Sequence, residues 1–223
     1  MWVFWVLFFV VAIVLIVGMV RTERRRLESH VKECQVVAAK MGISFEYDVP
    51  DALVSKVKGF DLTYSDGDRL PQAVRDVFSQ RSPEEDLYVF LHEHHSDKAG
   101  GVGGWWHRET VACLVSPRLQ LSRFRLSPER AVERVASMFG ILDVDFDSHP
   151  GFSRSYFLNA KDEAAIRSLF DWKVLTFFEN HPGFHVEGNG DTLIIYQFNK
   201  PITLKELPHF LKIVNEIADL FRI

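Results

Sequence analysis

Cysteine is scarce in this sequence. The 223 residues include two, Cys34 and Cys113, which are far apart and form no C-x-x-C pair. Small disulfide-stabilised domains and thiolate zinc sites need more cysteines at closer spacing, so the sequence excludes both classes. Two isolated thiols fit a reducing compartment, and nothing in the sequence pairs either of them with a base that would activate a nucleophile.

Motifs of nucleotide binding and of hydrolysis are also missing. The glycines of 100–104 do not make a dinucleotide-binding fingerprint, because Trp106 stands where the last glycine should be, and no Walker A lysine follows them. The sequence contains no G-x-S-x-G nucleophile elbow. It therefore favours a non-catalytic protein and predicts no cofactor other than zinc.

Basic residues are not in excess. The chain has 26 Lys and Arg against 30 Asp and Glu, a net charge of -4 and a pI near 6.1. Nucleic acid binding depends on a basic surface that neutralises phosphates, so this balance argues against a nucleic acid partner.

Charge and proline are absent from residues 1–20. A helix from Trp2 to Val20 would be apolar on every face. Its length would be about 29 Å, close to the roughly 30 Å of a bilayer's hydrocarbon core. The sequence predicts a transmembrane helix over residues 1–20, with the lipid bilayer as a partner and with Trp2 and Trp5 at the lipid interface. A cleaved signal peptide would need a basic start and a small-residue cleavage site, and neither is present.

A cluster of arginines follows this segment, namely Arg21, Arg24, Arg25 and Arg26. By the positive-inside rule they predict a single-pass protein of the cytoplasmic (inner) membrane, with its N-terminus outside and residues 21–223 in the cytoplasm. The same arginines belong to the predicted membrane interface, where they either set only the topology or also contact anionic headgroups.

Residues 21–42 are predicted to continue the helix as a juxtamembrane segment that ends at Gly42. Apolar residues repeat at heptad spacing over Leu27, Val31, Cys34, Ala38 and Met41. Because about two heptads are fewer than a stable coiled coil needs, two alternatives stay open. The helix either packs on its own domain or forms a homo-oligomer.

Residues 43–223 are predicted to form an α+β domain with a mostly antiparallel sheet and a sub-boundary near 140–150. Two strand-like segments, 87–94 and 105–115, flank a glycine-rich connection, and a turn at 188–191 predicts a second hairpin. Helices are predicted at 71–78, after Ser127, and at 161–170, 172–179 and 204–221, and a further strand is predicted at 152–158.

The run FSRSYFLNAKDEAAIRSLFDWKVLTFF, residues 152–178, joins a turn, an aromatic strand, an acidic helix start and a leucine-rich helix. Together with segments 109–114 and 207–211, it resembles bacterial single-pass membrane-anchored proteins of a family known only as a domain of unknown function. The likeness covers residues 40–222 and consists of hydrophobic pattern and turns. It implies a bacterial membrane protein and is silent on activity and catalytic residues.

The segment His92-Glu93-His94-His95 is the most suggestive chemical group. On a strand, His92 and His94 share one face, and His107 on the returning strand can lie opposite. Two strand histidines with a cross-strand histidine or carboxylate can bind zinc or copper. His92, His94 and His107 are therefore candidate ligands of a metal sensor or metal-dependent hydrolase. The alternative is a solvated sheet face.

Trp105 and Trp106 begin the returning strand. Neighbours on a strand point to opposite faces, so one indole should face the core and the other solvent, where Trp is a frequent contact residue in protein interfaces. The leading hypothesis is a membrane-anchored protein whose cytoplasmic domain binds another membrane or cytoplasmic protein as an accessory or scaffold subunit.

Overall fold

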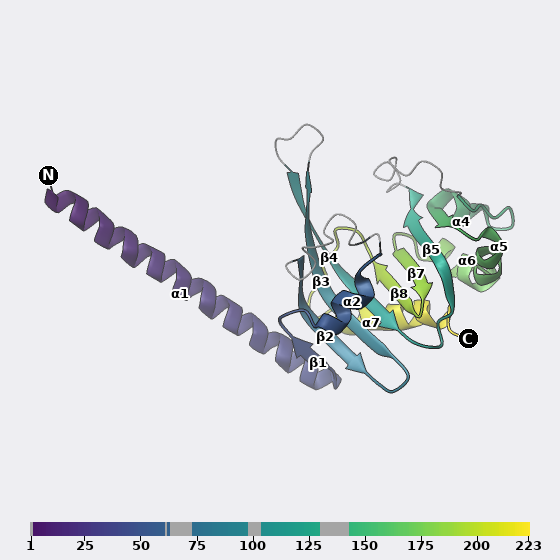
Figure 1. Cartoon of the computed structure of the whole chain (residues 1–223), viewed down its shortest axis with the longest axis horizontal. Helices are drawn as coiled ribbons and strands as arrows, with labels where there is room; N and C mark the ends of the chain where they lie inside the picture. Colours follow the sequence, from purple (N-terminus) through teal and green to yellow (C-terminus); the bar gives the residue numbers. More distant parts are fainter. Residues whose placement is uncertain (1, 61, 63–72, 98–103, 130–142) are drawn as a thin grey trace. The chain divides into compact units, whose positions relative to one another are not determined.

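The structure is a computed structural model of the chain, and it describes residues 2–60, 62, 73–97, 104–129 and 143–223 (Figure 1). The chain divides into two compact units, Met1–Gly42 and Ile43–Ile223. The first unit is one continuous helix, α1, from Trp2 to Met41. Gly42 ends it with a φ of +69°, a left-handed conformation that glycine adopts without steric cost, and its N–H donates to the Ala39 carbonyl.

The predicted transmembrane helix over residues 1–20 is contradicted. Among the described residues, no helix is long and apolar enough to cross a membrane. The same finding contradicts the predicted placement as a single-pass protein of the inner membrane with a cytoplasmic C-terminal domain.

The second unit is an α+β fold built on one eight-stranded antiparallel sheet. Its order is β1-β2-β3-β4-β8-β7-β5-β6. The strands are β1 (Ser44–Glu46), β2 (Val74–Arg81), β3 (Asp86–Asp97), β4 (Gly104–Val115), β5 (Leu121–Pro128), β6 (Tyr156–Ala160), β7 (His185–Gly190) and β8 (Thr192–Tyr196). The hairpin turn predicted at 188–191 joins β7 to β8, whereas β4 and β8 are distant in sequence and meet in the middle of the sheet.

Five described helices complete this unit: α2 (Asp51–Val57), α4 (Pro150–Ser155), α5 (Glu163–Leu169), α6 (Trp172–Asn180) and α7 (Leu207–Asp219). Asp162 and Asp171 cap α5 and α6 by accepting backbone N–H groups. The helix α7 begins at Leu207 and not at the predicted residue 204. This start places Pro208 in the first helical turn, where a residue without a backbone N–H is tolerated.

Two predicted elements differ from the structure. Residues 74–78, expected in a helix, belong to β2, and residues 152–155, expected in a strand, belong to α4. The strand β5 continues to Pro128, and most of the helix predicted after Ser127 lies outside the described residues.

The sheet is covered on both faces. On one face α2 and the segment after it pack on a core that comprises Leu53, Val57, Phe60, Leu62, Val74, Val77, Tyr88, Phe90, Val111, Cys113, Ile194 and Tyr196. Arg123 of β5 reaches the Gly59 carbonyl on that side, while the adjacent Phe124 packs against Phe221, which follows α7. Because neighbours on a strand point in opposite directions, α7 covers the other face.

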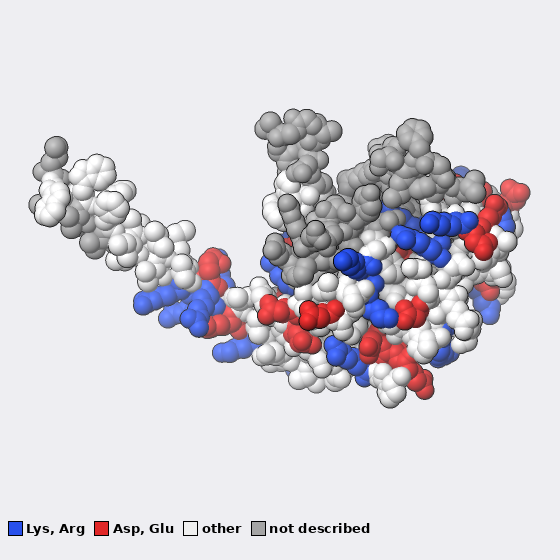
Figure 2. Space-filling model, in the orientation of Figure 1, with Lys and Arg blue, Asp and Glu red and all other residues white. Residues whose placement is uncertain are grey.

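Charged residues of both signs are interspersed over the described surface in view in Figure 2. The ion pairs of the second unit include Lys56 with Asp191 and Arg222 with Glu85. On the described part of the second unit in this view, residues of the two signs lie next to one another.

Candidate functional site

The central strands β3 and β4 are longer than their neighbours. They pair with each other from Asp86–Val115 out to Asp97–Gly104. The pairing of β2 with β3 ends at His92, and the pairing of β8 with β4 ends at Val111. Residues 93–97 and 104–108 therefore form a two-stranded extension, called the ribbon here, which passes beyond the adjacent strands (Figure 1).

Both tryptophans of the ribbon are exposed. Trp105 is 72% exposed and Trp106 is 70% exposed, and the ring of Trp106 meets His95 edge-on at 5.2 Å. The prediction that one of the two would face the core is wrong. The two indoles do leave opposite faces of β4, but at this position the ribbon has passed the end of the sheet and its packed layers.

A polar cluster lies at the base of the ribbon, on the face that carries α2. His92 is paired directly across the strands with Glu109, and His94 with His107. His92 is 0% exposed, Glu109 1% and His94 17%. The apolar core of this face thus ends in a layer of ionisable side chains, which is an expensive arrangement unless these groups satisfy one another.

Glu109 is the centre of the cluster. Its Oε1 is hydrogen-bonded to His92 Nδ1 at 2.9 Å and lies 3.3 Å from His94 Nδ1. Its Oε2 accepts a hydrogen bond from the Asn199 backbone N–H at 3.2 Å. Burial by itself would raise the pKa of Glu109, but the hydrogen bonds and charge of His92 and His94 prevail and lower it to about 2.

The predicted metal ligands are brought together only in part. The ligand atoms of His92, His94 and Glu109 all lie within 4.8 Å of one another. The ring of His107 lies tilted beside that of His94, with centroids 5.0 Å apart, and its other neighbour is the ring of Phe198 at 4.9 Å. His107 is thus a neighbour of the group, and the third potential ligand atom comes from Glu109 on the paired strand.

Glu109 was not singled out from the sequence. The signal for it was strand parity, because Glu109 is two residues after His107 and so shares its face. The opposite face at this level carries Glu93, which forms ion pairs with Arg75 at 2.6 Å and with Arg108. The ribbon base therefore has a buried His–Glu face and a half-exposed Arg–Glu face.

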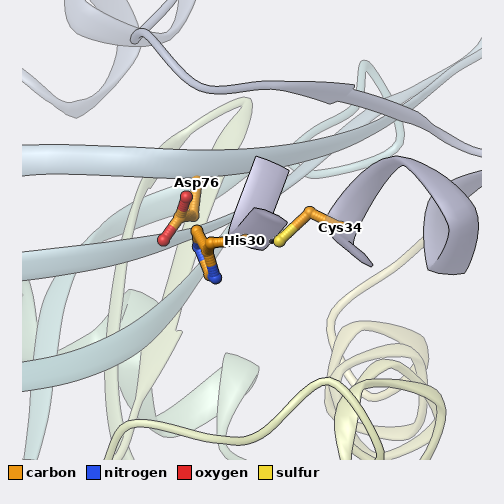
Figure 3. A group of neighbouring side chains, drawn as sticks. All are labelled: His30, Cys34 and Asp76. Carbon is orange, nitrogen blue, oxygen red and sulfur yellow. Dashed lines mark hydrogen bonds between the residues drawn. The ribbon is translucent and has the colours of Figure 1, made fainter. Parts of the chain in front are cut away.

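A second pair of ligand-type side chains lies on α1. His30 and Cys34 are one helical turn apart, with His30 Nε2 3.7 Å from Cys34 Sγ (Figure 3). Asp76, also labelled in Figure 3, belongs to β2 in the second unit. Within α1 the pair offers two ligand atoms, which is fewer than the three or four of protein zinc sites.

The residues predicted for a membrane interface all lie on α1. Trp2 and Trp5 are exposed. Arg24 and Arg26 form ion pairs within the helix, to Glu28 at 3.0 Å and to Glu23 at 3.3 Å. Such exposed pairs along a helix contribute a few tenths of a kcal/mol each.

Comparison with known proteins finds a similar fold and no matching family. No family model matches the chain, and no curated protein matches it. The chain is similar in structure to the crystal structure of the mycobacterial trehalose monomycolate transport factor A, TtfA, with a TM-score of 0.57 and 15% sequence identity. The match covers 86% of this chain and 94% of that chain. At this identity the likeness shows that the two share a fold.

Proposed function

We propose that this protein is a non-catalytic accessory subunit that binds a partner protein through the exposed end of its β3–β4 ribbon. The observation that carries the proposal is the exposure of Trp105 and Trp106, side by side in sequence at 72% and 70%. Leaving two indoles in water forgoes a large hydrophobic gain, of roughly 25 cal/mol for each Å² of apolar surface that a partner would cover. Tryptophan is also the residue type most enriched among the energetically dominant positions of protein interfaces.

The shape of the ribbon supports one mode of binding. Because the two indoles leave opposite faces of β4, a flat partner surface would cover only one of them. A partner with an apolar groove would cover both, with the ribbon inserted into it. Arg108 and Glu93, at the base of the ribbon, are partly exposed and supply the polar rim that surrounds the apolar centre of a typical interface.

An accessory role in transport is the finer part of the proposal. It is supported by the fold shared with a protein whose name describes a transport factor. We therefore expect the partner to belong to a transport assembly, with this chain acting as a binding subunit.

The test compares two tryptophan sites in the full chain. A photo-crosslinking amino acid is placed at position 105 or at position 172. Trp172 on α6 is also exposed, at 65%, but α6 packs beside β6, an edge strand that three other strands separate from β4. We expect one protein to be cross-linked from position 105 in its native cells and not from position 172. The affinity of that purified protein should then fall about 30-fold or more in the Trp105→Ala/Trp106→Ala variant, which is the scale of an interface hot spot.

The matched control is Trp172→Ala, which should leave the affinity unchanged. Circular dichroism of both variants should match the parent chain, because exposed side chains contribute little to folding. Equal affinity of the ribbon variant and the control would refute a binding role for the ribbon.

A further inference from the structure

We infer that His92, His94 and Glu109 form a binding site for one zinc-class divalent ion at the base of the ribbon. This site lies beyond the proposed function and does not rest on it, because the partner-binding surface is made by Trp105 and Trp106. The inference starts from the arrangement of three potential ligands that come from two paired strands and converge on one point.

The distances suit a bound ion. Zinc is held about 2.0–2.2 Å from imidazole nitrogen and carboxylate oxygen, so ligand atoms around one ion are roughly 3 to 3.6 Å apart. His92 Nδ1 and His94 Nδ1 lie 2.9 Å and 3.3 Å from the same Glu109 oxygen, Oε1. Small rotations of the two rings would therefore be enough to seat an ion among these three atoms.

The surroundings hold the ligands in place. The second oxygen of Glu109 is engaged by the Asn199 backbone N–H, which leaves Oε1 to face the histidines. The ring of His94 is stacked on that of His92, with centroids 5.1 Å apart, and lies tilted against that of His107, with centroids 5.0 Å apart. Such supporting contacts orient metal ligands and are typical of metal sites in proteins.

The three candidate ligands differ in their exposure to solvent. His92 and Glu109 are fully buried, whereas His94 is 17% exposed and connects the cluster to solvent. A site with three protein ligands keeps a fourth position for water or another ligand, as catalytic zinc sites do. Two imidazoles and one carboxylate are a nitrogen-rich, borderline set, which favours zinc and its first-row neighbours over magnesium or calcium.

The competing explanation is a closed hydrogen-bond network. In that case an Nδ1–H of His92 donates to Glu109, and the cluster is satisfied without any ion. The two explanations exclude each other at His92 Nδ1, because a nitrogen that binds a metal must give up its proton, whereas a nitrogen that donates to Glu109 must keep it. Zinc binding therefore distinguishes them.

The experiment uses the full chain, purified without a histidine tag and stripped with a chelator. Zinc binding is measured by isothermal titration calorimetry, and cobalt is used as a spectroscopic probe of tetrahedral coordination. We expect one ion per chain. Affinity should fall about 100-fold or more in His94→Ala and Glu109→Gln, since even residues that only orient a ligand typically contribute 10- to 100-fold.

His95→Ala is the matched control, because His95 is on the same strand and exposed on its opposite face. It should bind zinc like the parent chain. His94→Ala is the primary variant because a partly exposed position tolerates truncation better than the buried His92. Folding is checked by circular dichroism, and saturating zinc should raise the Tm of the parent chain and of His95→Ala but not of the other two variants.

Binding of less than about a tenth of an equivalent by the parent chain would establish the hydrogen-bond network in place of the metal site. Loss of binding in His95→Ala with retention in His94→Ala would assign the metal to adventitious surface histidines and would equally overturn the inference. Neither result bears on partner binding, which the tryptophan variants test separately.

Discussion

Gly188 is a position where a single methyl group should destabilise the fold. Gly188 of β7 is paired with Phe124 of β5. A Cβ atom at Gly188 would lie 2.3 Å from Cε1 of Phe124 and 2.9 Å from Cδ1 and Cζ. The shortest of these distances is 1.1 Å less than the 3.4 Å at which ordinary contact begins. Gly188→Ala therefore forces the ring of Phe124 to move.

The ring has little room to move. Phe124 is buried, and its ring packs against Phe170 with centroids 5.2 Å apart and against Phe221 with centroids 5.5 Å apart. Overpacking of a close-packed core costs about 1–3 kcal/mol. Replacing glycine by alanine returns about 0.4–1 kcal/mol by restricting the unfolded chain. We therefore expect Gly188→Ala to lower the free energy of unfolding by about 1–2 kcal/mol.

The assay is urea denaturation followed by the near-ultraviolet circular dichroism of the aromatic residues. A double-mutant cycle isolates the cause, because Phe124→Ala removes the atoms that the new methyl group would meet. In that background, Gly188→Ala should cost almost nothing. The reasoning is refuted if Gly188→Ala is as stable as the parent chain, or if the two substitutions add without coupling.

Three further predictions concern other buried or paired groups. Burial raises the pKa of Cys113 to about 12. In a Cys34→Ala background this thiol should therefore resist Ellman's reagent at pH 8 and react once urea unfolds the chain, and rapid labelling of the native protein would contradict its burial. The Tyr156 hydroxyl donates to the His181 carbonyl and accepts from the Phe184 N–H. Tyr156→Phe should therefore lower the free energy of unfolding by about 1–3 kcal/mol in urea titrations, and an unchanged midpoint would refute this prediction. The hydrogen bond from Lys56 lowers the pKa of Asp191 below 3.8, so Lys56→Ala should return it toward that value in an NMR titration. The pair's small contribution to stability, under about 1 kcal/mol because both side chains are exposed, is present above pH 3.8 and is lost as the pH falls through the lowered pKa.

Local sequence pattern was most informative where strands alternate strictly. The segments 87–94 and 105–115 lie within β3 and β4, and alternation alone predicted that His92 and His94 share one face. The strand β2 was missed because it contains an irregularity between Arg75 and Phe78, with Asp76 at a φ of +56°. Such a bulge inserts a residue, so Val74, Val77 and Phe78 acquire a spacing typical of a helix.

The candidate site shows the same division. His92 and His94, two of the three histidines of β3, could be chosen from their spacing, whereas Glu109 required the register that sets it opposite His92. The exposure of both tryptophans could not be predicted from alternation. It depends on where β2 and β8 stop, and these strands come from other parts of the chain.

The sequence by itself determined the alternation of side chains along each strand, the caps and turns, and the absence of recognised catalytic motifs, because these depend on residues close together in the chain. Only the tertiary structure decided which strands are neighbours, where the ribbon leaves the sheet, and which carboxylate meets the histidines. Those features depend on register between distant segments, and a shift of one residue would turn every side chain of a strand to the other face.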